Sequence, residues 1–185
     1  MKVRFALGFL GAFTVLLVLW GTTGFARGYR VAALWGARVL SPALTGWWLD
    51  VPASDDDPGT FRKGSQSIPL QIDPGFLSIA QVPLAALIVA TPGLGVGPTV
   101  IRVLLGMGIF FLIHLGVLLL YPVVLATPNL LTDTVGVFSG LLSFVLAPQL
   151  LWFVLTYDRL RALWQLEGAR RAPQGREQRG KRERV

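Results

Sequence analysis

The sequence predicts an all-α polytopic membrane protein with four transmembrane helices, an interfacial helix and a small β-hairpin-like cap on the outer side. Two observations predict this class. Of the 185 residues, 53% are hydrophobic and only 15% are charged, whereas charged residues make up about 25% of ordinary soluble domains. The hydrophobic residues also lie in long runs between short polar segments, which indicates lipid as the solvent. The same composition excludes a disordered chain, because disorder requires low hydrophobicity.

Four apolar segments are candidates for crossing a bilayer, which takes a helix of about 20 apolar residues. They cover residues 5–25, 75–91, 103–125 and 134–157. The second segment is short and contains Gln81 and Pro83. We therefore expect it either to continue to residue 97 as a kinked span or to form a re-entrant hairpin.

The distribution of basic residues sets the predicted orientation, since lysine and arginine prefer the cytoplasmic side. With four spans, Lys2, Arg4, Arg102 and the basic residues of the C-terminal tail all lie inside. Three spans would place the N-terminal pair and the tail on opposite sides. We therefore predict a multi-pass protein of the bacterial inner membrane with both termini cytoplasmic. The first segment also resembles a signal peptide with a small-x-small site at residues 24–26, but its length favours an uncleaved anchor.

The predicted organisation follows from these spans. Its parts are transmembrane helix 1 (residues 1–25), a periplasmic interfacial helix and cap (26–74), transmembrane helices 2 (75–97), 3 (98–126) and 4 (127–158), and a basic cytoplasmic tail (159–185). The charge of the tail is typical of a segment that faces anionic lipid. We expect no nucleic-acid partner, because no aromatic platform accompanies the arginines.

The outer segment begins with an amphipathic pattern over residues 26–49. Apolar side chains recur there at helical spacing: Tyr29, Ala33, Leu34, Leu40 and Leu44. Pro42 is expected to kink the helix or end it near Ser41. Three tryptophans suit the lipid headgroup boundary: Trp35, Trp47 and Trp48. Alternation at Ile68, Leu70 and Ile72 predicts an edge strand, with residues 61–63 as its hairpin partner.

The clearest packing signal is a stripe of small residues in the fourth segment. The stripe consists of Gly136, Gly140, Ser143 and Ala147. Such a stripe allows a second helix to approach closely, either within this bundle or from a partner protein. The stripe is therefore our candidate partner-binding face.

The candidate polar site within the membrane is His114, the only histidine. It is expected to hydrogen-bond across helices, although a proton relay or a ligand site is the functional alternative. An intramembrane hydrolase with Ser139 or Ser143 as nucleophile and His114 as base is a further hypothesis, but no nucleophile-elbow motif accompanies it. One histidine and no cysteine leave too few ligands for a haem or transition metal, so we expect no cofactor, no metal and no catalytic residue.

Several short motifs occur in a recognisable order. A basic start and an apolar anchor precede a tryptophan-rich outer segment. The chain then contains Asp73-Pro74-Gly75-Phe76-Leu77-Ser78, Val82-Pro83-Leu84-Ala85-Ala86-Leu87, Ala90-Thr91-Pro92 and Leu146-Ala147-Pro148-Gln149-Leu150-Leu151-Trp152. Across residues 3–164 this order resembles the small bacterial membrane proteins associated with exosortases, such as those associated with exosortase H.

The resemblance implies a role beside an enzyme. Exosortases are transpeptidase-like membrane enzymes that act on C-terminal sorting signals and use a cysteine with arginine partners. This chain has no cysteine, so the resemblance implies a non-catalytic accessory whose partner is an exosortase or its substrate. The alternative function is a small transporter or channel subunit for an apolar or amphipathic molecule, since broken helices tend to lie at transport sites.

Overall fold

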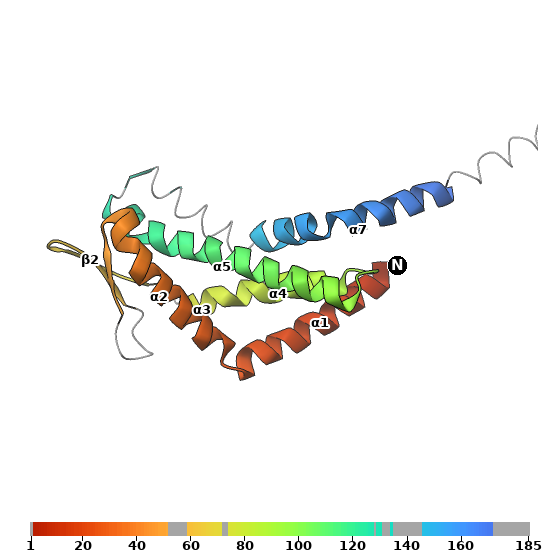
Figure 1. Ribbon diagram of the computed structural model, residues 1–185, viewed down its shortest axis with the longest axis horizontal. Helices are drawn as coiled ribbons and strands as arrows, with labels where there is room; N and C mark the ends of the chain where they lie inside the picture. The colour runs from red at the N-terminus through yellow and green to blue at the C-terminus, as the bar shows by residue number, and fades with distance from the viewer. Residues whose placement is uncertain are drawn as a thin grey trace, which may run out of the picture.

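The structure is a computed structural model that describes residues 2–51, 59–71, 74–127, 129–130, 134 and 146–171. It is mostly helical, with one small antiparallel sheet (Figure 1). The helices are α1 (Lys2–Thr22), α2 (Phe25–Thr45), α3 (Pro74–Leu77), the 3₁₀ turn η1 (Ser78–Ala80), α4 (Gln81–Ala90), α5 (Val96–Ala126) and α7 (Ala147–Arg171). The strands are β1 (Trp48–Asp50), β2 (Thr60–Lys63) and β3 (Gln66–Pro69).

Helices α1, α4, α5 and α7 form a bundle in which α4 runs antiparallel to α1, and α5 runs antiparallel to both α4 and α7. Trp20 near the end of α1 hydrogen-bonds Ser78 just before α4, while Gly8 near the start of α1 faces Ala90 at the end of α4. Helices α4, α5 and α7 meet at Gly106, where a Cβ atom would lie 3.1 Å from Leu155 and 3.2 Å from Leu84. A side chain at position 106 would displace these leucines by a few tenths of an ångström, so Gly106 favours this close approach.

A cap consisting of α2 and the three strands lies at one end of the bundle, and the N-terminus lies at the other (Figure 1). The strand order is β1-β2-β3, with Leu49 opposite Phe61 and Phe61 opposite Ile68. The side chains of Leu49 and Phe61 are buried in one cluster with residues of α2 and with Leu115 and Leu118 of α5. Helix α5 therefore contributes to the cores of both the bundle and the cap.

Glycines shape the two ends of α2. Gly24 has a φ of 69° and forms the corner between α1 and α2. Gly46 has a φ of 73°, and its N–H donates to the carbonyl of Pro42. L side chains rarely adopt this left-handed region, so both corners favour glycine.

Two of the four predicted spans are found as helices long and apolar enough to cross a membrane, namely Val3–Thr22 and Val96–Ala126. The second predicted span is shorter than expected, because α4 ends at Ala90 and a turn at Pro92 and Gly93 separates it from α5. Neither a helix continued to residue 97 nor a single long span is formed. Residues 135–145 of the fourth predicted span lie outside the described residues, and its last part forms the start of α7.

The outer segment differs from the prediction at three points. Helix α2 continues past Pro42 to Thr45, where the Thr45 hydroxyl donates to the carbonyl of Ser41 at 2.9 Å. The cap contains a third strand, β1, so its sheet is larger than a hairpin. Trp47 is buried in the cap core rather than placed at a lipid boundary, and Nζ of Lys63 lies 5.9 Å from the centre of its ring.

Candidate functional site

A buried polar cluster joins the cap to the bundle. The Tyr29 hydroxyl of α2 lies 2.7 Å from Nδ1 of His114 on α5. Both side chains are buried, and the His114 ring stacks edge-on against Phe110 at 4.6 Å between ring centroids. A hydrogen bond between two buried groups is costly to break, because a partner left alone is shielded from water and has no other group to bond. The pair therefore fixes the position of α2 against α5.

Gln81, the first residue of α4, completes this cluster. Burial raises the pKa of the Tyr29 hydroxyl well above its usual range, and an interaction with the Gln81 side chain opposes that rise. Tyr29 is therefore a neutral hydrogen-bonding group at physiological pH. Two nitrogens of the cluster, Nε2 of His114 and Nε2 of Gln81, are buried without a hydrogen-bond partner in the described part of the chain. Buried polar atoms without a partner are rare in folded proteins, so this cluster is an unusual feature of the interior.

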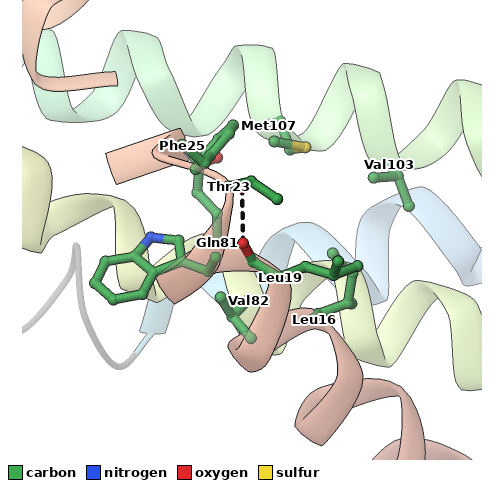
Figure 2. A pocket seen from close by; sticks show the side chains of 10 residues that line it. Leu16, Leu19, Thr23, Phe25, Gln81, Val82, Val103 and Met107 are labelled. Atoms are coloured by element: carbon green, nitrogen blue, oxygen red, sulfur yellow. Dashed lines mark hydrogen bonds between the residues drawn. The ribbon is translucent and has the colours of Figure 1, made fainter. Parts of the chain in front are cut away.

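A groove lies beside Gln81, between α1, α4 and α5 (Figure 2). Its volume is about 170 Å³. The lining side chains are Leu16, Leu19, Trp20, Thr23, Phe25, Gln81, Val82, Ala85, Val103 and Met107. Gln81, Val82 and Ala85 are buried and form its floor, whereas Leu19 and Thr23 are exposed and form its rim. We call this the bundle groove.

The other polar groups of the bundle groove already have partners. The Thr23 hydroxyl donates to the carbonyl of Leu19 at 2.7 Å, which is the dashed line in Figure 2. The Trp20 indole N–H donates to the Ser78 hydroxyl at 2.7 Å. Nε2 of Gln81 is thus the donor of this lining that lacks a partner among the described residues.

A second hollow lies on the surface of the cap, over α2 and the sheet, with a volume of about 590 Å³. It is lined by Trp35, Arg38, Val39, Pro42, Ala43, Trp48, Leu49, Asp50 and Arg62. Trp35 is 68% exposed and Trp48 is 67% exposed. Arg62 pairs with Asp50 across neighbouring strands at 3.2 Å. We call this hollow the cap groove.

Only one member of the predicted small-residue stripe lies in the described part of the chain. Ala147 is buried against Leu84, Ile88 and Phe110, so its small side chain serves packing within this bundle. The predicted partner face at Gly136, Gly140 and Ser143 lies outside the described residues, as does the nucleophile candidate Ser139. These residues are consequently not placed relative to His114.

An ion pair joins α5 and α7 at the end of the bundle away from the cap. The guanidinium of Arg102 donates to both carboxylate oxygens of Asp158, at 2.9 and 3.1 Å. Its second terminal nitrogen is buried without a partner in the described residues. Within those residues, no group of three or more metal-ligating side chains comes together.

The functional residues that sequence reasoning missed are Tyr29 as the partner of His114 and Gln81 as the polar member of the bundle groove. The position of Tyr29 on the apolar side of the predicted interfacial helix was the available signal for the first. Gln81 interrupts an otherwise apolar segment, which was the signal for the second, because polar residues at membrane depth are costly.

Comparison with known proteins found no relative: no family model, curated protein or solved structure matches the chain.

Proposed function

We propose that this protein is an integral membrane protein that acts as a non-catalytic accessory and binds a membrane partner through its cap groove. The observation that carries the proposal is the pair of tryptophans, Trp35 and Trp48, each about two-thirds exposed beside a hollow of about 590 Å³. Exposed tryptophan and arginine beside a concavity are typical of the residues that dominate protein–protein binding energy.

The exposed surface of α1 supports membrane embedding. None of its most apolar 18-residue window is buried within the protein, so water or lipid must cover these side chains. Contiguous apolar surface on this scale is rare in soluble monomers. Lipid is the solvent that makes such a helix stable.

We propose four crossings of the bacterial inner membrane, with both termini in the cytoplasm. Pairing of Trp20 with Ser78 and of Gly8 with Ala90 makes α4 run back alongside α1. The 17 residues from Pro74 to Ala90 reach about 25 Å as helix, so a slightly thinned bilayer would accommodate them. Helix α5 has 31 residues, or about 46 Å, and exceeds a hydrocarbon core of about 30 Å by enough to enter the cap.

The proposed partner is an exosortase sorting system. This part of the proposal rests on the order of motifs in residues 3–164. A cap fixed to the helical bundle by the Tyr29–His114 hydrogen bond suits an accessory that positions a partner or its substrate at the membrane surface.

Co-purification of the full-length protein with the exosortase of the same bacterium tests this function. The double variant Trp35→Ala/Trp48→Ala should lower recovery of the complex at least about tenfold, as expected for loss of dominant binding residues. Leu44→Ala is the matched control, because Leu44 is on the same helix and is 67% exposed but does not line the cap groove. Unchanged recovery in the double variant would refute the cap groove as the binding surface.

The bundle groove favours a second candidate function, a subunit that handles an apolar or amphipathic molecule. Its floor is hydrocarbon apart from Gln81. A flux assay in liposomes separates the two functions, since an accessory that only binds a partner produces no flux.

A further inference from the structure

The cap groove lies along the outer strand of the cap sheet. Its lining includes all three residues of β1, and the strand order β1-β2-β3 places β1 at one side of the sheet. One edge of β1 pairs with β2, and its other edge pairs with no strand in the described part of the chain. The free N–H and C=O groups of such an edge form a template for an added strand. An extended segment of another polypeptide therefore fits this position.

The side chains of β1 alternate between the cap core and the surface. Leu49 is 3% exposed and belongs to the cap core, whereas Trp48 and Asp50 on either side of it are exposed. Trp35 on α2 lines the same groove and is exposed as well. An extended segment beside β1 therefore meets two indole rings, against which apolar or β-branched side chains pack.

One positive charge in the lining of the cap groove lacks a counterion. The lining contains two arginines, Arg38 and Arg62, and one carboxylate, that of Asp50. Asp50 pairs with Arg62 at 3.2 Å, whereas Arg38 forms no ion pair or hydrogen bond with any residue that the structure describes. A guanidinium presents a fork of donors that matches a carboxylate. The charge of the groove therefore favours an acidic occupant.

We propose that the cap groove binds an extended acidic segment of the partner protein, which adds to the sheet beside β1. A carboxylate of the segment pairs with Arg38, and its apolar side chains lie against Trp35 and Trp48. Because β1 has only three residues, the added strand forms few ladder hydrogen bonds, and these three side chains supply most of the selectivity. The inference rests on the proposed function, since it specifies the chemistry of the segment that the cap groove receives.

A peptide selection tests this inference with the full-length protein in phosphatidylcholine nanodiscs. A library of short random peptides is first cleared on empty nanodiscs and then selected on those that hold the protein. The enriched peptides are synthesised, and their affinities are measured at physiological salt. We expect them to contain aspartate or glutamate within a run of alternating β-forming residues. Enrichment of basic peptides, or no enrichment over empty nanodiscs, would overturn the proposal.

Charge variants test the role of Arg38. Arg38→Glu should weaken binding of the acidic peptides at least about tenfold, because repulsion replaces attraction. Selection on this variant should enrich basic peptides instead. Lys63→Glu is the matched control, since it makes the same charge change at an exposed residue of β2 that does not line the groove. It should alter the affinity by less than about twofold, and equal losses in the two variants would refute the pairing with Arg38.

Methylation of the peptide backbone tests the added strand. Peptides that are N-methylated at alternate positions keep their side chains but lose every second backbone donor. The two alternate sets should differ in affinity by at least about fivefold, because only one set of N–H groups faces β1. Equal affinities of the two methylated forms would show that no strand is added to the sheet.

Two comparisons separate this inference from the proposed function and from a lipid ligand. If Trp35→Ala/Trp48→Ala loses the exosortase complex but the enriched peptides lack acidic residues, the accessory function stands and the acidic segment is wrong. If acidic peptides bind as expected but that double variant retains the complex, the site stands and its partner is another protein. The ratio of peptide affinities between the wild type and Arg38→Glu should persist when phosphatidylglycerol replaces part of the phosphatidylcholine. Loss of this ratio would assign Arg38 to lipid headgroups and overturn the proposal.

Discussion

Replacing Tyr29 by Phe should destabilise the protein by removing its link between cap and bundle. The lost hydrogen bond spans 2.7 Å between two side chains of which Tyr29 is 7% exposed and His114 fully buried. Phenylalanine retains the ring and its edge-on contact with Phe111, 5.4 Å between centroids. The cost is therefore the unpaired Nδ1 of His114, which we place at about 1–3 kcal/mol.

A double-mutant cycle isolates this interaction. His114→Leu should cost a similar amount, because it leaves the Tyr29 hydroxyl without its partner. The double variant Tyr29→Phe/His114→Leu should be more stable than the sum of the two single changes predicts, by about 1–2 kcal/mol, since neither unpaired group remains. The measurement is the free energy of unfolding in mixed micelles titrated with sodium dodecyl sulfate and followed by far-ultraviolet circular dichroism.

The control for this cycle is Tyr157→Phe, which removes an exposed hydroxyl on α7 and should change stability by less than about 0.5 kcal/mol. Additive effects of Tyr29→Phe and His114→Leu would show that the two residues do not interact. A neutral Tyr29→Phe variant would refute the argument that this hydrogen bond holds the cap in place.

Two further predictions concern Tyr29 and the corner between α1 and α2. Above pH 10 an unfolded tyrosine, with a pKa of 10.0, releases its proton, whereas buried Tyr29 keeps its proton in the folded state. The free energy of unfolding should therefore fall by about 1.4 kcal/mol per pH unit above pH 10. Alkaline unfolding titrations of the wild type and Tyr29→Phe test this, and equal slopes would contradict it. Gly24→Ala should cost about 1–2 kcal/mol through backbone strain alone, because space around Gly24 is open and its φ is 69°. Gly28→Ala, also in open space but inside α2, should instead stabilise by about 0.5–1 kcal/mol, and the same sign for both changes would refute the strain argument.

Local pattern predicted the helices that lie in apolar runs. The third predicted span, residues 103–125, lies within α5 and ends one residue before it. The helix begins earlier, at Val96, because Pro98 lies in its first turn, where backbone N–H groups have no helical partner in any case. Proline therefore lies within the start of the helix at this position.

The expectation that Pro42 would kink α2 or end it near Ser41 does not match the observed helix, which ends at Thr45. Pro42 lacks only the N–H that would bond the carbonyl of Arg38, and α2 continues for three residues beyond it. The Thr45 side chain and Gly46 bond the carbonyls of Ser41 and Pro42, so the last turn remains paired. Tertiary contacts of α2 with α5 outweigh the local cost of the proline.

The buried face of α2 was only partly predictable. Tyr29, Ala33 and Leu34 are buried as their spacing indicates, but Leu40 and Leu44 are exposed. Ala37 and Ser41 take the inner positions, because small residues allow α2 to approach α5 closely. Strand β1 and the Tyr29–His114 pair were not predictable, since both depend on contacts between residues far apart in the chain.

Helix α5 couples the two halves of the molecule through adjacent residues. Phe110 belongs to the core of the bundle, Leu115 belongs to the core of the cap, and His114 between them bonds the cap helix α2. A single uninterrupted helix thus contributes to both cores from residues that are little more than one helical turn apart. Because packed cores respond to displacement as units rather than by local bending, a partner that moves the cap must also move the wall of the bundle groove. Binding at the cap groove and binding of an apolar molecule in the bundle groove should therefore change each other's affinity by the same factor, as linkage requires.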